Sequence, residues 1–323
     1  MDWNDKIILL TGGTGSFGQK FTEIMLSQYR PKVIRIFSRD ELKQWEMQRK
    51  FNNDDRLRFF IGDIRDRKRL EMAFEGVDIV VHAAALKHVP VCEYNPFEAV
   101  KTNIMGAQNI IEAALSHNVD KVIALSTDKA VNPVNLYGAT KMCMEKLFIA
   151  ANSYVGLKRQ TRMSCVRYGN VVGSRGSIVP LLKTQKETGT VTITDDRMTR
   201  FWLTLDQAVA LVMKALDTMR GGEVFVPKIP SMRIPDLVAA LAPECAVNHI
   251  GIRPGEKLHE CLITEDEARH AAEFDDLFVI EPERPQWNRT PIEGGKPVPE
   301  GFRYTSDNNT IWLNAKELTE MVK

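Results

Sequence analysis

The residues of this chain best suited to chemistry lie in one short stretch, STDKAVNPVNLYGATK, at positions 126–141. Tyr137 and Lys141 are four residues apart, so on a helix their side chains share one face. An ammonium beside a phenol stabilises the phenolate and lowers the tyrosine pKa from its reference value of about 10. The spacing therefore predicts that Tyr137 is a base near neutral pH, although Y-x-x-x-K alone is a common chance match.

Asp128 and Lys129 stand side by side a few residues before the tyrosine. Neighbouring charge and partial desolvation shift the pKa values of such a pair, so that a lysine can be poised as a base and a carboxyl as an acid. The alternative is a solvated ion pair in a surface loop. Ser126 or Thr127, just upstream, supplies a hydroxyl that can bond a substrate oxygen.

The elements that must position these residues alternate regularly. Short apolar runs rich in valine and isoleucine predict five strands, and segments with three- and four-residue apolar spacing predict the helices between them. The expected strands are 6–12, 32–38, 57–63, 77–85 and 120–127, and the expected helices are 16–28, 39–51, 67–76 and 96–118. This order predicts an α/β fold with a Rossmann-type doubly wound parallel sheet, whose carboxyl edge holds the chemical stretch.

The regular alternation weakens after a sixth expected strand at 163–174, where proline and glycine become frequent. A helix at 204–220 and a strand at 222–227 return to the first domain. We therefore expect a nucleotide-binding domain of residues 1–173 plus about 204–231. The remaining segments, 174–203 and 232–323, are expected to form a smaller, discontinuous α/β substrate-binding lobe.

A glycine-rich loop follows the first strand directly and opens a helix, in the sequence TGGTGSFG. Glycines at this place allow a tight turn and a close approach to a pyrophosphate, while the helix N-terminus favours negative charge. An ordinary glycine-rich turn is the alternative, which the strand–loop–helix context disfavours. The loop predicts a dinucleotide site with contacts from Gly12, Thr14, Gly15, Ser16, Phe17 and Gly18.

The end of the second expected strand indicates which dinucleotide is bound. NAD sites usually carry an acid there, whereas this chain has Ser38 and Arg39, with Lys43 close behind. A hydroxyl and two cations suit a 2′-phosphate, so NADP is the expected cofactor. Asp40 leaves two possibilities open, a ribose contact or a helix cap. Further cofactor contacts are expected from Asp63, Ile64, Ala83, Ala84, Lys87, Tyr137 and Lys141.

Composition excludes several classes of function. The net charge is +1 with basic and acidic residues interspersed, so nucleic acid is not an expected partner. Five scattered cysteines without a C-x-x-C pair predict free thiols in the cytoplasm. No apolar run reaches the length of a signal peptide or a membrane span, so no membrane contact is expected. The histidines lack a set of partner ligands, so no metal is expected.

The motifs together resemble the extended short-chain dehydrogenase/reductase family, and more closely the UDP-N-acetylglucosamine 4,6-dehydratases. The resemblance covers nearly the whole chain. It is carried by TGGTGSFG, SRDELKQ, HAAALKHVP, NPFEAVKTNIMGA, ALSTDKAVNPVNLYGATK, VRYGNVVGSRGS, MTRFW and GIRPGEKLHE. Among these enzymes the chain is most similar to the compact 5-inverting members that open pseudaminic acid biosynthesis, because it lacks the N-terminal spans of the membrane-anchored relatives.

This resemblance implies a reaction on UDP-N-acetylglucosamine. Carbon 4 is oxidised, water is lost across carbons 5 and 6, and hydride returns to carbon 6, giving UDP-2-acetamido-2,6-dideoxy-β-L-arabino-hex-4-ulose. It implies Tyr137 as the carbon 4 base, Lys129 as the carbon 5 base and Asp128 as the acid that aids water departure. A homo-oligomer, dimer or hexamer, is implied as well.

The lobe is expected to hold the sugar nucleotide. Arg253 suits the pyrophosphate and Glu256 the ribose hydroxyls, with further contacts expected from Lys87, Asn170, Ser177, Thr199 and Arg200. A solvated turn is the other interpretation of the RPGE stretch. A retaining dehydratase and a carbon 4 epimerase are the alternative enzymes. A non-catalytic NADP-sensing regulator would not need Asp128, Lys129, Tyr137 and Lys141 together.

Overall fold

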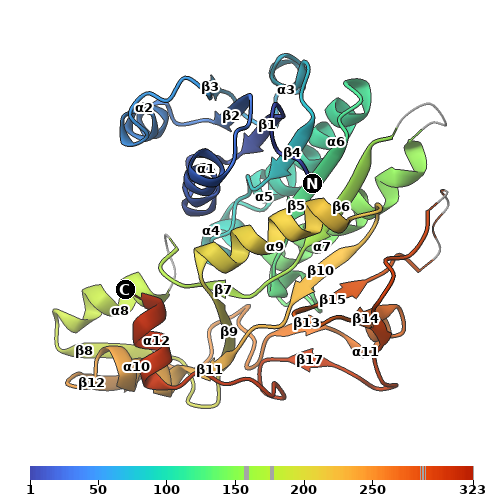
Figure 1. Cartoon of the computed structure of the whole chain (residues 1–323). Helices are drawn as coiled ribbons and strands as arrows, with labels where there is room; N and C mark the ends of the chain where they lie inside the picture. The colour runs from blue at the N-terminus through green and yellow to red at the C-terminus, as the bar shows by residue number, and fades with distance from the viewer. Residues whose placement is uncertain (156–159, 175–177, 284, 286, 288, 323) are drawn as a thin grey trace.

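A long, mostly parallel sheet forms the centre of the molecule (Figure 1). The structure, a computed structural model, describes residues 1–155, 160–174, 178–283, 285, 287 and 289–322. Within them, one sheet has the strand order β16-β14-β15-β10-β6-β5-β4-β1-β2-β3. Its parallel strands are β1 Ile7–Thr11, β2 Val33–Ser38, β3 Leu57–Ile61, β4 Ile79–His82, β5 Lys121–Leu125, β6 Arg162–Val166 and β10 Val224–Pro227. Their order, with the reversal between β1 and β4, confirms the predicted Rossmann-type fold.

Helices cover both faces of this sheet (Figure 1). On one face α1 packs against α9, and on the other α3 packs against α6, which lies beside α7. These helices are α1 Ser16–Gln28, α2 Glu41–Lys50, α3 Arg67–Phe74, α4 Val89–Tyr94, α5 Pro96–Val100, α6 Gly106–Ser116, α7 Leu136–Ala150 and α9 Leu205–Thr218. Burial of β4 on both faces explains why its sequence, IVVH, is a continuous apolar run rather than an alternating one.

A smaller lobe with its own apolar core lies below the carboxyl edge of the sheet (Figure 1). Trp202, Val191 and Leu237 are buried at its centre. Full burial of a valine or leucine side chain, such as Val191 or Leu237, stabilises the fold by about 1.5–3 kcal/mol. The lobe contains β7 Asn170–Val171, α8 Ile178–Lys186, β8 Thr190–Ile193, β9 Thr199–Leu203, β11 Ser231–Arg233, α10 Ile234–Leu241, β12 Ala246–His249 and α12 Ala315–Val322.

The segment after the lobe differs from the expectation. Residues 271–297, expected in the lobe, return to the main sheet as β14 Ala271–Glu273, β15 Leu277–Ile280 and β16 Lys296–Pro297. Strand β15 pairs antiparallel with β10 and thereby protects the edge that the parallel sheet would otherwise expose. The remaining elements of this segment are β13 Cys261–Ile263, α11 Glu265–Ala268 and β17 Tyr304–Thr305. The lobe core therefore draws on 172–202, 232–245 and 313–322, and residues 271–297 do not contribute to it.

The helix expected at 96–118 is also interrupted. It divides into α5, a π-helical turn η1 at Lys101–Met105, and α6. Such turns are frequent at functional sites. None of the helices in the described part of the chain is long and apolar enough to cross a bilayer.

Candidate active site

One cavity of about 1010 Å³ lies between the carboxyl edge of the sheet and the lobe. This is where ligands bind in open α/β sheets. Most of the residues singled out in the sequence meet here. The cavity is lined by Gly12, Thr14, Gly15, Ser16, Phe17, Gly18, Ser38, Arg39, Lys43, Asp63, Ile64, Ala83, Ala84, Lys87, Thr127, Lys129, Tyr137, Lys141, Asn170, Arg200, Arg253 and Glu256.

The glycine loop has the geometry of a cradle for a pyrophosphate. Gly12 has φ +67°, and a Cβ there would lie 2.8 Å from the backbone nitrogen of Ala84. A Cβ on Gly18 would lie 2.3 Å from the carbonyl oxygen of Gly13. Both positions therefore require glycine, and the loop leads straight into the N-terminus of α1, where backbone N–H groups favour an anion. These residues fit a dinucleotide.

At the end of β2, Asp40 makes the helix cap that was one of its two expected roles. Its Oδ1 accepts a hydrogen bond from the Lys43 backbone nitrogen at 3.0 Å, so Asp40 is the N-cap of α2. Its Oδ2 also pairs with Lys43 Nζ at 2.7 Å. Arg39 is more than half exposed at the cavity and lies 3.7 Å from Asp63. A guanidinium with one long contact remains available for a phosphate.

Tyr137 and Lys141 both lie on α7, whose N-cap Asn135 accepts from the Gly138 nitrogen. Lys141 is buried, and its Nζ donates to the Leu125 carbonyl at 2.6 Å. Burial lowers the pKa of Lys141 to about 8. The expected lowering of the tyrosine pKa includes the charge of a bound nicotinamide, and the protein without its cofactor does not test it. Burial raises the pKa of Tyr137 to about 12, because loss of water around the phenolate outweighs the attraction of Lys129.

Asn103, in the π-helical turn η1, fixes the backbone beside the cavity. Its side chain accepts from the Leu86 nitrogen at 2.8 Å and donates to the Leu86 carbonyl at 2.9 Å. It also bonds Thr140, between the tyrosine and the lysine, at 2.9 Å. Asn103 thus joins the loop that carries Lys87 to α7. The sequence analysis missed it, since an asparagine within a helical pattern carries no signal of its own.

Asp128 and Lys129 form the short 3-10 turn η2 at Asp128–Ala130, directly after β5. Lys129 Nζ lies 3.1 Å from Asp128 Oδ1, which also accepts from the Thr127 hydroxyl at 2.9 Å. Asp128 is fully buried, and its Oδ2 has no hydrogen-bond partner. Lys129 lines the cavity and also approaches Asn170 Oδ1 at 3.5 Å. The solvated surface pair is thereby excluded.

The pKa values of Asp128 and Lys129 are both raised. Burial raises the pKa of Asp128, with a smaller opposing effect from Lys129. Burial alone would lower the pKa of Lys129, but the attraction of Asp128 and Glu260 outweighs it and the net shift is upward. A carboxyl whose pKa is raised fits the expected acid. A lysine held charged does not fit the poised base expected from the sequence, because two carboxyl groups rather than one face it.

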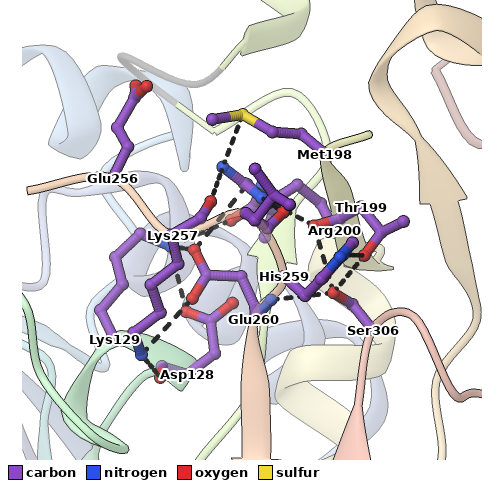
Figure 2. Close-up of polar contacts among 12 residues, drawn as sticks. Asp128, Lys129, Met198, Thr199, Arg200, Glu256, Lys257, His259, Glu260 and Ser306 are labelled. Carbon is purple, nitrogen blue, oxygen red and sulfur yellow. Dashed lines mark hydrogen bonds and ion pairs between the residues drawn. The ribbon is translucent and has the colours of Figure 1, made fainter. Parts of the chain in front are cut away.

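Glu260 is the second of these carboxyls, and the sequence analysis missed it. Its Oε1 lies 3.4 Å from Lys129 Nζ and 3.8 Å from Arg200 Nε, and its Oε2 lies 3.8 Å from Lys257 Nζ. Figure 2 shows these side chains converging, with Glu256 apart from them. Glu260 ends the GIRPGEKLHE stretch, so the four-residue spacing from Glu256 was the one available signal.

Two residues of β9 have different roles. Arg200 lines the cavity and is held by the carbonyl groups of Thr199 at 2.7 Å and Leu258 at 3.1 Å. Thr199, expected to bind the sugar nucleotide, is buried and does not line the cavity. Its hydroxyl bonds His259 Nδ1 at 2.9 Å and Ser306 Oγ at 2.6 Å. Alternation along the strand turns Thr199 away from the face that Arg200 presents.

Arg253 and Glu256 lie on the lobe side of the cavity, where Arg253 is about half exposed. Arg253 Nη1 lies 3.9 Å from Glu256 Oε1, and the Arg253 backbone nitrogen donates to Glu256 Oε2 at 3.3 Å. The guanidinium therefore remains able to bond a ligand. Lys87 also lines the cavity, and burial lowers its pKa, with a smaller effect from Lys129. Ser177, the remaining expected contact, lies outside the described residues. Among the described residues, no group of His, Cys, Asp and Glu is arranged to hold a metal ion.

Comparison with known proteins identifies the family. The sequence pattern of the polysaccharide biosynthesis protein family matches residues 8–282. This chain belongs to that family. Two UDP-N-acetylglucosamine 4,6-dehydratases (inverting) from Campylobacter jejuni strains are 52% and 53% identical to it, over 99% of this chain and 98% of theirs. The resemblance to these dehydratases is therefore confirmed.

A solved structure and a relative with a different name bear on the fold and on the alternative activities. The X-ray structure of Pen from Bacillus thuringiensis superposes with a TM-score of 0.90 at 41% identity, covering 100% of this chain and 99% of that one. A UDP-glucose 4-epimerase from Rickettsia conorii is 43% identical over 98% of this chain and 95% of its own length. Proteins similar to this chain over nearly its whole length thus include some named 4,6-dehydratases and some named 4-epimerases.

Proposed function

We propose that this chain is a UDP-N-acetylglucosamine 4,6-dehydratase that inverts carbon 5 and uses NADP. The observation that carries the proposal is Lys129, which lines the same cavity as Tyr137 and pairs with the buried Asp128. An acid and an amine next to the oxidising base are what loss of water requires and what epimerisation alone does not. The relatives named inverting dehydratases are 52–53% identical, against 43% for the epimerase.

Tyr137 takes the proton of the carbon 4 hydroxyl in this proposal. When bound, the nicotinamide supplies the acceptor of hydride from carbon 4 and its donor to carbon 6. The protein's own groups hold the pKa of Tyr137 at about 12 because of burial, so phenolate formation depends on positive charge beside the phenol. Lys141, charged below its lowered pKa of about 8, is the buried cation of α7.

Asp128 and Lys129 carry out the elimination. The carbon 4 ketone acidifies the hydrogen on carbon 5, and removal of that proton expels the carbon 6 hydroxyl as water. Asp128, whose pKa burial raises, holds the proton that the leaving hydroxyl needs. Lys129 reaches into the cavity, and because its pKa is raised we assign its ammonium form to the return of a proton to carbon 5. The proton that leaves carbon 5 passes to water on the opposite face of the ring, as inversion at that carbon requires.

The proposed preference for NADP rests on Arg39. Its exposed guanidinium lies at the end of β2, and the acid that follows it in the sequence, Asp40, caps α2. We expect Arg39→Ala to weaken NADP binding by about 10- to 100-fold, the equivalent of about 1.5–3 kcal/mol for a lost charged hydrogen bond. NAD binding should hardly change. Titration calorimetry with both nucleotides measures this.

The matched control for Arg39 is Arg49→Ala, which removes an exposed guanidinium of α2 that stacks on Trp45. It should leave the affinities for both nucleotides unchanged. A wild-type chain that binds NAD as tightly as NADP would contradict the assignment of Arg39.

Cellular setting and assembly are finer parts of the proposal. We propose a cytoplasmic enzyme at the start of pseudaminic acid synthesis, since all five cysteines are free thiols. We also propose a homo-oligomer, dimer or hexamer. Val91, Tyr94 and Phe97 are exposed on α4 and α5, a set of large apolar side chains that suits a subunit contact. Light scattering of the purified chain measures the assembly.

Proton NMR of the reaction in heavy water tests the proposed function. UDP-N-acetylglucosamine should be converted to a product with a new carbon 6 methyl group, one solvent deuterium on carbon 5 and the inverted ring configuration. A retaining dehydratase would give the same methyl group with the original configuration at carbon 5. A carbon 4 epimerase would leave the 6-hydroxyl intact, and a regulator would show no turnover. Each of these three results would refute the proposal.

A further inference from the structure

Glu260 is a buried carboxyl that lines the cavity. Its side chain is 3% exposed, and its backbone is fixed on both sides by Ser306, whose Oγ accepts from the Glu260 nitrogen at 2.9 Å and whose nitrogen donates to the Glu260 carbonyl at 2.8 Å. Ser306 is itself buried and bonded to Thr199. The carboxylate therefore projects from a rigid frame, which a residue that orients others requires.

The charged groups around Glu260 come from three separate parts of the chain (Figure 2). Lys129 belongs to η2, Arg200 to β9 and Lys257 to the loop before β13, and all three cations lie within 3.8 Å of its oxygens. Lys257 Nζ in turn contacts the carbonyls of Asp128, at 3.4 Å, and Val131. Glu260 thus joins the η2 turn to the lobe through two lysines.

Lys129 Nζ lies between two carboxyl groups, at 3.1 Å from Asp128 and 3.4 Å from Glu260. With Asp128 alone the long lysine side chain would be free to swing into the cavity. The second carboxylate, on a different element, restricts it to one direction. Burial opposes the charge of Glu260, but its three cations outweigh that effect and lower its pKa, so it stays ionised.

We propose that Glu260 is a positioning residue of the dehydration step, which acts through Lys129 by holding its ammonium at the cavity wall beside Asp128. This inference rests on the proposed function, because it assigns Lys129 to proton transfer at carbon 5. Glu260 itself transfers no proton to the sugar. Its negative charge also keeps the neighbouring acid and amine protonated, since it raises the pKa of both Asp128 and Lys129.

The test compares Glu260→Gln and Glu260→Asp with wild type. Elimination is followed by the NMR methyl signal in heavy water, and carbon 4 oxidation by absorbance of the reduced nicotinamide in a single turnover. We expect Glu260→Gln to slow elimination by about 10²-fold, the low end of what a positioned acid or base contributes, while oxidation stays near the wild-type rate. Glu260→Asp keeps the charge and should restore part of the loss.

Two readouts separate positioning from a merely structural role. The pH profile of elimination should move to lower pH in Glu260→Gln, because removing the negative charge lowers the pKa of Asp128 and Lys129. The double variant Lys129→Met with Glu260→Gln should be no slower than Lys129→Met alone, since the two residues act as one unit. Glu265→Gln, an exposed carboxyl in the first turn of α11, is the matched control and should behave as wild type.

Equal loss of oxidation and elimination, an unmoved pH profile or additive effects in the double variant would overturn the inference. If Glu260→Gln does not fold, as shown by melting, Glu260→Asp is measured in its place, and a loss of oxidation equal to its loss of elimination would overturn the inference. The wild-type product distinguishes the two levels of the proposal. A carbon 4 epimer as sole product refutes the proposed function, whereas a methyl product formed equally fast by Glu260→Gln refutes the role of Glu260 alone.

Discussion

Replacing Tyr137 with phenylalanine is expected to slow carbon 4 oxidation by about 10³-fold, within the range that general bases contribute, or about 4 kcal/mol of barrier. The substitution removes one oxygen and keeps the ring that packs against Cys92 and Ala99. Because later steps need the carbon 4 ketone, methyl formation should fall by the same factor. Single-turnover absorbance of the reduced nicotinamide measures the oxidation directly.

The rate of carbon 4 oxidation should also depend on pH in a definite direction. Burial raises the pKa of Tyr137, so the phenolate fraction grows as the pH rises through the neutral range. The wild-type oxidation rate should therefore increase with pH, and Tyr137→Phe should lose that dependence.

Tyr154→Phe, at an exposed tyrosine just beyond α7, is the matched control and should keep both the rate and the profile. A Tyr137→Phe enzyme that oxidises carbon 4 at the wild-type rate would show that another group removes the proton.

The fold was predictable where its elements carry strong local patterns. Strands β1 to β5 are short, largely apolar runs separated by helices, and such runs at this spacing specify a parallel sheet. The segment after Cys261 has no such signal. Its strands are two to four residues long, and the place of β14 to β16 is decided by pairing outward from the β10 edge, which the sequence of the segment does not reveal.

The candidate site shows the same division. The glycine loop and the stretch from Thr127 to Lys141 are contiguous motifs, and the cavity contains nearly all of their chemically active side chains. Glu260 lies 131 residues after Lys129 in the chain, and their meeting depends on how the lobe packs on the sheet. The upward shift of the Lys129 pKa could not be predicted from the DK pair for the same reason, because it depends on the second carboxyl, Glu260.

Asp128→Asn and Lys129→Met are expected to separate oxidation from elimination. Each removes one ionisable member of the pair, so methyl formation and deuterium uptake at carbon 5 should fall by about 10²- to 10⁴-fold. Oxidation at carbon 4 should continue, because Tyr137 is untouched. The reduced nicotinamide should then accumulate in a single turnover, and its absorbance together with the NMR methyl signal measures the two steps on one sample.

Loss of a buried partner also destabilises the fold, by about 3–5 kcal/mol when a charge is left unpaired, so thermal melting and nucleotide binding must accompany the rates. Lys101→Met, at an exposed lysine of η1 that pairs with Glu98, is the matched control and should leave both steps unchanged. If Lys129→Met is folded, binds nucleotide and still forms the methyl product at the wild-type rate, the proton at carbon 5 is handled elsewhere. In that case Asp128→Asn should still stop at the carbon 4 ketone. Its carboxyl is needed for the departure of water, whichever group handles the carbon 5 proton.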